Sequence, residues 1–428
     1  MQLNYKRTFL VGLAFFSICT FWQVYDGLVP LMLKNTFHVG DSMAGVIMAL
    51  DNILALFLLP LFGAISDRAG KRMPFIVGGA LAAAVLIVIL PLADRSKSLA
   101  LFFVALGLLL LCMGTYRSPA VALMPDVTPK PLRSKGNAVI NLMGTLGGAL
   151  SLVIVKLLVT KTASGGEDYL FVFLAVAVLM ILSTVVLSLT IREKTLVDEM
   201  RKINYGVDPA KEAAETADAG GNKLSPDVMR SLLLILLSVA FWYMGYNAVT
   251  TAFTKYAATQ WGQGVGGAAN CLLIATGGAM VSYIPIGMLS SKFGRKRIIQ
   301  LGILLLCACF VIGAVAADRF HPALYAMFLV VGFAWAAINV NSYPMVVELS
   351  RGSDVGKYTG YYYTFSMAAQ IVTPIVSGTL LEHVGYWTLF PYAAVLVALS
   401  FVTMSLSRHG DNRPQAPASR LEAFDTAD

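Results

Sequence analysis

The chain has 428 residues, of which 57% are hydrophobic and only 13% are charged, and its formal net charge is +8. Because soluble proteins carry about 25% charged residues, this composition excludes an ordinary water-soluble globular protein. The positive charge does not indicate a nucleic-acid surface, because Lys and Arg are concentrated in short loops between apolar segments.

Twelve apolar segments are long enough to cross a membrane, which takes about 20 residues of helix. In chain order they are 9–33, 43–65, 74–93, 99–124, 137–160, 169–191, 230–257, 265–290, 298–317, 322–346, 357–382 and 386–407. Most Lys and Arg residues fall on one side if the N-terminus is cytoplasmic, which is the positive-inside pattern. We therefore predict an all-α polytopic membrane protein of the cell (inner) membrane, with both termini cytoplasmic.

The chain contains an internal repeat. A glycine-rich basic loop beginning at Gly63 recurs from Gly287 at an offset of 224 residues, and the same offset relates Gly70 to Gly294. Six apolar segments lie on each side of a polar stretch. The predicted organisation is two pseudo-symmetric six-helix halves, with an N-terminal bundle at 1–191, a cytoplasmic linker at 192–229, a C-terminal bundle at 230–408 and a disordered cytoplasmic tail at 409–428.

The apolar segments are of two kinds. The third and sixth of each half (74–93, 169–191, 298–317 and 386–407) contain few polar residues, whereas the other eight contain most of the polar and ionisable ones. A uniformly apolar helix can face lipid, but polar side chains must face a bundle interior or a water-filled cavity. This pattern predicts four peripheral helices around a path between the halves.

Asp26 and Asp51 lie within predicted spans of the first half, at similar depth, and could share a cavity. A carboxylate within a membrane can bind a proton or a cation, although either Asp could instead serve only to stabilise the structure. Arg117 is predicted to lie about ten residues deeper, too far for an ion pair with either Asp. It could contact a substrate oxygen, a backbone carbonyl freed by Pro119 or an Asp in another conformation. It could instead extend to the membrane border, which is also expected of Lys255.

The second half has neutral polar and aromatic residues at the corresponding positions. They form helical faces that suit the hydroxyl groups and the C–H face of a sugar, although such residues also join transmembrane helices or lie at membrane interfaces. The predicted sugar-binding residues are Tyr243, Tyr246, Asn247, Trp335, Asn339, Tyr362 and Gln370.

The loop Gly63-x-x-x-Asp67-Arg68-x-Gly70-Lys71-Arg72 resembles that of the major facilitator superfamily. Two further stretches, Trp22 to Pro30 and Tyr116 to Asp126, resemble the sucrose-type and glycoside–cation symporters. The resemblance implies the major facilitator fold, with Asp67 and Arg68 joining the halves on the cytoplasmic side and Gly63 allowing close helix packing. The predicted gating residues are Gly63, Asp67, Arg68, Gly70 and Arg72.

The resemblance also implies roles for residues of the first half. Asp26 is expected to contact the sugar and is also a candidate to bind a proton, and Asp51 with Asn52 is expected to bind the coupling cation. Trp22, Tyr25 and Arg117 complete the predicted substrate site.

These observations predict a secondary active transporter that couples H⁺ or Na⁺ to symport of a sugar, such as a disaccharide, by alternating access. The alternatives are an exporter or antiporter of amphipathic compounds, a sugar uniporter, or a membrane sensor. The expected partners are the small-molecule sugar and the lipid bilayer. We expect a monomer with no enzyme activity, no metal site, no nucleic-acid partner and no cofactor besides the coupling ion.

Overall fold

The computed structural model describes residues 3–129, 133–161, 166–204, 225–316, 319–347, 349 and 355–410. Within these residues, twelve helices are long and apolar enough to span a membrane, which confirms the predicted fold class. In the first half they are α1 (Tyr5–Asn35), α2 (Asp41–Ala69), α3 (Met73–Arg95), α4 (Leu99–Asp126), α5 (Arg133–Leu158) and α6 (Leu170–Thr190). In the second half they are α9 (Pro226–Gln260), α10 (Val265–Phe293), α11 (Arg295–Ala316), α12 (Leu324–Val347), α13 (Val355–His383) and α14 (Leu389–Leu406).

Shorter elements accompany the spans within the described residues. A short hairpin precedes α6, helix α7 follows it, and a 3-10 turn, η3, precedes α14. Their bounds are β1 (Thr160–Lys161), β2 (Glu167–Asp168), α7 (Glu193–Asn204) and η3 (Tyr386–Thr388). Most of the predicted linker, at 205–224, and of the predicted tail, at 411–428, lies outside the described residues.

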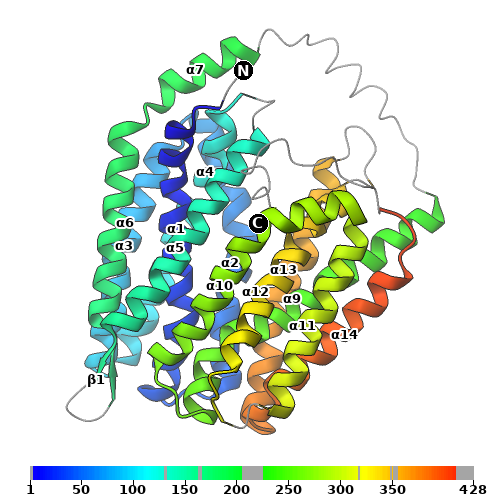
Figure 1. Cartoon of the computed structure of the whole chain (residues 1–428). Helices are drawn as coiled ribbons and strands as arrows, with labels where there is room; N and C mark the ends of the chain where they lie inside the picture. Colours follow the sequence, from blue (N-terminus) through cyan, green and yellow to red (C-terminus); the bar gives the residue numbers. More distant parts are fainter. Residues whose placement is uncertain are drawn as a thin grey trace.

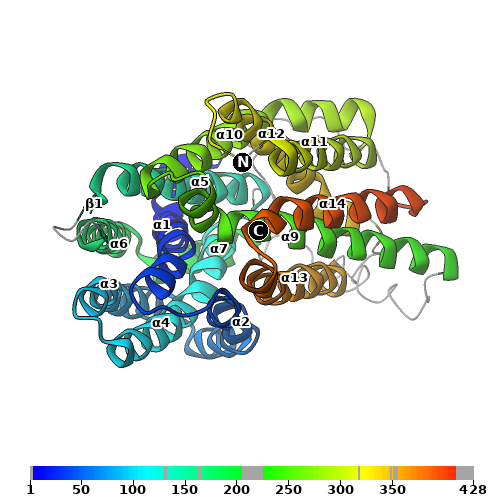
Figure 2. The same cartoon turned by 90° about the horizontal axis from the view of Figure 1, so that it is seen from below.

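The two halves repeat one packing pattern (Figures 1 and 2). In the first half α1 packs on α5 and α6, and α3 packs on α4 and α6. In the second half α9 packs on α13 and α14, and α11 packs on α12 and α14. These are equivalent pairs under the 224-residue offset. The repeat extends to the loops, since Gly70 and Gly294 follow α2 and α10 with φ of 61° and 94°, values that favour glycine.

The halves meet through α1, α2 and α5 on one side and α9, α10 and α13 on the other. The principal contacts of α3, α6, α11 and α14 are with helices of their own half, which agrees with the prediction of four peripheral helices. Their outer surfaces are apolar, as in Leu189 of α6 and Val315 of α11, each 77% exposed. Such surfaces suit contact with lipid.

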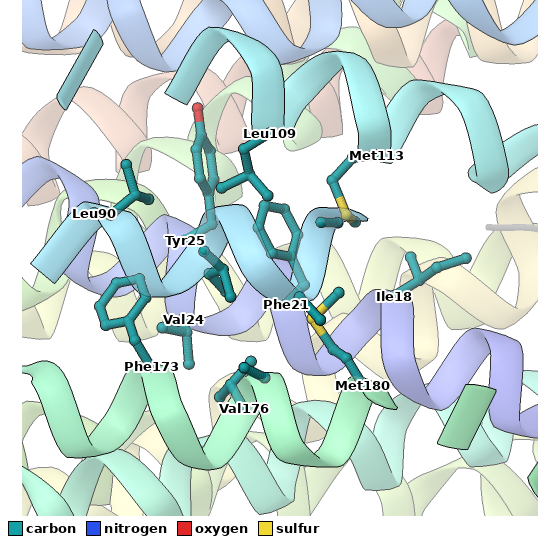
Figure 3. Packing of buried hydrophobic residues seen from close by; sticks show 14 of the residues in the cluster. Ile18, Phe21, Val24, Tyr25, Leu90, Leu109, Met113, Phe173, Val176 and Met180 are labelled. Atoms are coloured by element: carbon teal, nitrogen blue, oxygen red, sulfur yellow. The ribbon is translucent and has the colours of Figure 1, made fainter. Parts of the chain in front are cut away.

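Each half has its own hydrophobic core, and α1 supplies much of the first (Figure 3). Phe21 and Tyr25 point from α1 toward Leu109 of α4, while Val24 points toward Phe173 of α6. Because lipid is as apolar as these side chains, close packing and not removal from water stabilises the helix contacts. Tyr25, predicted to bind substrate, is 1% exposed within this core.

Glycines bring α2 and α13 into backbone contact at one end of the bundle. A Cβ at Gly45 of α2 would overlap the carbonyl oxygen of Pro374 in α13, and a Cβ at Gly378 of α13 would overlap the carbonyl oxygen of Asp41. Small residues permit this approach between membrane helices. We call this the opposite end, since it lies away from the N-terminus and α7, which mark the terminal end (Figure 1).

We expect Gly45→Ala to destabilise this arrangement by about 1–3 kcal/mol, the usual effect of adding a methyl group where no space exists. The measurement is thermal unfolding of the purified protein in detergent, where the midpoint should fall. Gly107→Ala is the control, because a Cβ there meets no atom within 4 Å. It should leave the midpoint unchanged or raise it slightly, since alanine favours helix over glycine by about 1 kcal/mol. Equal midpoints for the two variants would contradict the predicted overlap.

Candidate functional site

A cavity of about 260 Å³ lies between α1 and α5 of the first half and α10 of the second. Its described lining residues are Phe15, Cys19, Trp22, Gln23, Asp26, Asn141, Gly144, Thr145, Gly148 and Thr276. The cavity therefore lies at the interface between the halves, where the two arrays of polar residues were expected to meet.

The helical repeat explains how the sequence forms this lining. The α1 residues recur at spacings of three, four and one, so they occupy one face, and Tyr25, about 100° around the helix from that face, enters the core. On α5, two glycines leave space beside Asn141 and Thr145. Next to them, Gly147 lies against the carbonyl oxygen of Phe16, which holds α5 close to α1.

The lining combines one carboxylate with neutral polar groups. Asp26 is its one charged residue among those that the structure describes, and Gln23, Asn141 and Thr145 supply amide and hydroxyl groups. Trp22 adds an aromatic face. Such a surface can accept and donate several hydrogen bonds to a neutral polar solute.

Asp51 lines a separate, much smaller cavity of about 10 Å³, which also contains Arg117 and Trp22. Trp22 thus borders both cavities, and Asp26 and Asp51 do not share one, contrary to the expectation. The Arg117 guanidinium lies 5.7 Å from the centroid of the Trp22 ring, within the range of a cation–π interaction. Asn52 donates a hydrogen bond of 2.9 Å to Asp51.

The side chain of Arg117 lies closer to Asp51 than the backbone position of Arg117 predicted. Among the described residues it forms no ion pair with Asp26 or Asp51, as expected, but it lies beside Asp51 in the same cavity. The prediction compared backbone positions only, whereas a long arginine side chain spans several ångströms along the helix axis.

The predicted sugar-binding aromatics of the second half pack on one another. Tyr246 stacks on Trp335 with ring centroids 3.7 Å apart, and Tyr243 meets Trp335 edge to face. The hydroxyl of Tyr362 lies 2.9 Å from that of Ser342. In this conformation one face of the Tyr246 ring and one face of the Trp335 ring are therefore covered by each other. The cavity lining includes none of Tyr243, Tyr246, Asn247, Trp335, Asn339, Tyr362 and Gln370.

A buried charge cluster joins the halves at the opposite end, and we call its members Lys34, Asp41, Lys255 and Tyr386 the Asp41–Lys255 cluster. Lys255 of α9 donates to Asp41 of α2 across 2.7 Å, and both are 5–6% exposed. The Tyr386 hydroxyl donates to the other Asp41 oxygen, and Lys34 donates to Tyr386, each across 2.5 Å. Lys255 was expected to extend to the membrane border; the structure shows a buried ion pair instead.

Asp41 was not among the predicted functional residues, because an acidic residue at a helix start ordinarily serves to interact favourably with the helix dipole. The sequence does place two opposite charges, Asp41 and Lys255, at similar depth near the outer ends of two spans. Sequence alone does not say that α2 and α9 approach each other there.

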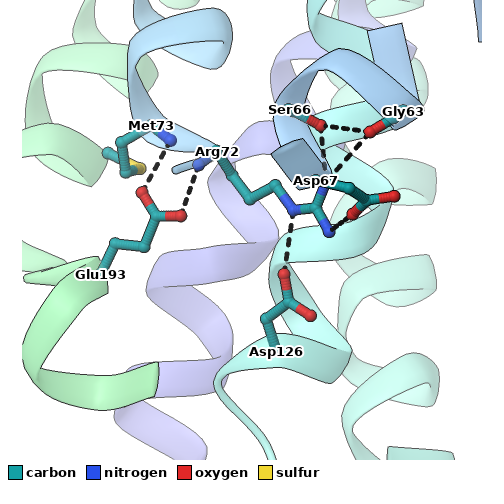
Figure 4. Close-up of polar contacts among 7 residues, drawn as sticks. All are labelled: Gly63, Ser66, Asp67, Arg72, Met73, Asp126 and Glu193. Carbon is teal, nitrogen blue, oxygen red and sulfur yellow. Dashed lines mark hydrogen bonds and ion pairs between the residues drawn. The ribbon is translucent and has the colours of Figure 1, made fainter. Parts of the chain in front are cut away.

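The glycine-rich basic loop forms a network at the terminal end (Figure 4). Arg72 donates across 2.9 Å to Asp126 of α4 and across 2.5 Å to Ser66, and it also forms an ion pair with Asp67. A Cβ at Gly63 would lie 2.9 Å from the Ser118 hydroxyl, in line with the close packing expected there. All these partners belong to the first half.

Asp67 and Arg68 were expected to hold the two halves together. In this conformation Asp67 pairs with Arg72 of its own loop, and Arg68 is exposed. Glu193 of α7 adds a further link within the half, accepting hydrogen bonds from the backbone amides of Arg72 and Met73.

Several polar contacts between the halves lie at the opposite end. Besides the Asp41–Lys255 cluster they include the Ser42 amide to Glu382 across 2.6 Å and the Val265 amide to Glu167 across 3.2 Å. The structure is therefore closed at the opposite end.

Comparison with known proteins gave a family and a fold. The model of the Major Facilitator Superfamily matches residues 11–259 and 235–425. A comparison with curated protein sequences gave no significant match.

Solved structures resemble the chain at low sequence identity. The human organic anion transporter MFSD10 (TETRAN) has a TM-score of 0.60 and 16% identity, over 94% of this chain and 100% of that one. A mutant of the nucleoside transporter NupG has a TM-score of 0.68 and 16% identity, over 94% and 100%. A POT family transporter in complex with 5-aminolevulinic acid has a TM-score of 0.67 and 13% identity, over 94% and 96%. At this identity the likeness establishes the fold alone.

Proposed function

The chain belongs to the major facilitator superfamily, and from this premise we propose a secondary active transporter that couples entry of H⁺ or Na⁺ to uptake of a sugar. Alternating access by two halves needs a central site reached from one side at a time. A cavity between the halves, in a bundle closed at the opposite end, is consistent with one stage of that cycle.

The observation that carries the proposal is the position of Asp26 within that cavity, beside neutral amides and hydroxyls. A carboxylate inside a membrane bundle is costly, by about 2.5–3.5 kcal/mol on insertion scales, unless a proton or cation accompanies it. The same carboxylate can accept two hydrogen bonds from neighbouring sugar hydroxyls. One group can therefore bind both the substrate and the coupling ion.

The charge of the lining bears on substrate class. With Asp26 as its charged group, the cavity favours neutral polyhydroxyl compounds over organic anions, although one structural relative is an organic anion transporter. Another relative is a nucleoside transporter, and a nucleoside is also a glycoside. We therefore place nucleosides beside disaccharides among the substrates to test.

The test is uptake into proteoliposomes across a panel of disaccharides, monosaccharide glycosides, nucleosides and organic anions. Imposed pH, Na⁺ and voltage gradients are applied one at a time, with empty liposomes as the control. We expect one of the glycosides to accumulate only when a proton or Na⁺ gradient points inward. Equal uptake with and without both gradients would indicate a uniporter, and accumulation of organic anions alone would contradict the proposed substrate class.

A further inference from the structure

A second cavity, of about 300 Å³, lies at the terminal end of the first half. The first turns of α1 form one wall, and the junction between α6 and α7 forms the other. The lining residues are Asn4, Lys6, Arg7, Leu10, Thr190, Ile191, Arg192, Thr195 and Leu196. We call this the α1–α7 cavity; it shares no residue with the cavity that contains Asp26.

The α1–α7 cavity has an excess of positive charge. Lys6, Arg7 and Arg192 line it, whereas its lining includes no acidic residue among those described. Among the residues that the structure describes, Arg7 pairs with Glu199 at 4.0 Å. No described side chain forms an ion pair with Lys6 or Arg192. The carboxylate of nearby Glu193 is already bound by two backbone amides of the Gly63 loop.

The position of this cavity is at a membrane border. It lies where the span α1 begins, where the span α6 ends, and where α7 turns away from the axis of α6 (Figure 1). Exposed apolar side chains of α6 lead to it, with Leu182, Val186 and Leu189 on the face that continues to Thr190. A lipid tail lying along this face would bring its headgroup to the three basic side chains.

We propose that the α1–α7 cavity binds the headgroup of an anionic phospholipid. Arg and Lys bind phosphate oxygens through charge-assisted hydrogen bonds, and Thr195 can add a hydroxyl donor. Basic pockets between membrane helices are suited to such headgroups. The apolar residues Leu10 and Leu196 in the same lining suit the glycerol and the first carbons of the tails. This inference does not depend on the proposed transport activity.

The binding test uses the full-length protein with lipids of defined composition. The variant Lys6→Gln/Arg7→Gln/Arg192→Gln removes the three charges, and Arg230→Gln/Lys292→Gln/Arg297→Gln is the control. The control changes charge equally at exposed sites of the second half. Native mass spectrometry would count phosphatidylglycerol and phosphatidylcholine bound to each protein, and thermal unfolding would measure stabilisation by each lipid.

We expect phosphatidylglycerol to bind the wild type and the control more tightly than phosphatidylcholine. Each basic residue near an anionic headgroup contributes about fivefold in affinity, so the cavity variant should bind about a hundredfold more weakly. Equal binding of phosphatidylglycerol by the cavity variant and the control would overturn the proposal. Stabilisation by inorganic phosphate or glycerol 3-phosphate equal to that by the lipid would also overturn it, in favour of a soluble anion.

A second measurement leaves all three charges in place, in case the triple variant does not fold. Thr195→Cys in a protein lacking the native cysteines would carry a photoreactive group, and captured lipids would be identified by mass spectrometry. In vesicles of equal phosphatidylglycerol and phosphatidylcholine content, we expect preferential capture of phosphatidylglycerol. Capture of the two lipids in equal amounts would contradict the proposal. The same photoreactive group on a cysteine at Val315, an exposed residue of α11 in the second half, gives the background ratio of the two captured lipids.

Discussion

Asp26→Asn is expected to abolish accumulation of substrate while leaving the protein folded and inserted. A membrane potential of 100 mV supplies about 2.3 kcal/mol per charge, so one coupled ion supports accumulation of up to about fiftyfold. An amide cannot bind a proton or balance a cation, so the internal-to-external ratio should fall to about one. Uptake driven by imposed gradients, at constant protein content, is the measurement.

Asp51→Asn tests the second carboxylate in the same assay. If Asp51 and Asn52 bind the coupling ion, this variant also loses accumulation, although Asp51 does not line the larger cavity. Asp198→Asn is the matched control, because Asp198 lies exposed on α7. It should accumulate substrate like the wild type. Wild-type accumulation by both Asp26→Asn and Asp51→Asn would remove the basis for carboxylate coupling.

Lys255→Met should open the opposite end of the bundle. It leaves Asp41 buried without its closest cation, and removing one partner of a buried ion pair costs about 3–5 kcal/mol. Lys34, whose amino group is 3.9 Å from Asp41, can compensate in part, so we expect the lower end of that range. This corresponds to a shift of on the order of a hundredfold toward the open conformation, at 1.36 kcal/mol per tenfold.

The measurement is the rate at which a membrane-impermeant maleimide labels a cysteine at Met48, in a protein without the five native cysteines. Met48 is 5% exposed and lies beside the ion pair in the closed end. The double variant Asp41→Asn/Lys255→Met removes both charges and should label close to the original rate. Lys156→Met, an exposed lysine of α5 near the same end, should have little effect. Labelling of Lys255→Met at the original rate would show that the ion pair does not hold this end closed.

The contacts at the two ends suggest how the halves are held. At the opposite end, a buried ion pair and close backbone contacts at Gly45 and Gly378 join the halves. At the terminal end, Arg72 is bound by Asp67, Ser66 and Asp126 of its own half. Opening the opposite end therefore requires breaking charged contacts in a dry environment.

The sequence by itself determined the number of spans, the repeat and the four peripheral helices. These follow from local properties, because about 20 apolar residues must form a helix in lipid and polar residues must avoid lipid. The glycine at the end of α2 is of the same kind, since the positive φ of Gly70 is a local requirement. Gly63 and Arg72 were recognisable from the motif alone.

Only the tertiary structure decided which polar groups meet. Asp26 lines one cavity with Asn141 and Thr276, and Lys255 pairs with Asp41. These contacts depend on the rotation and tilt of helices that are distant in sequence. Helical spacing places residues on a face but does not say which helix covers that face. For the same reason Tyr25, one residue from Asp26, lies in the core, and Tyr246 stacks on Trp335. A period of 3.6 residues turns adjacent side chains about 100° apart, so the partners of each are set by packing between helices.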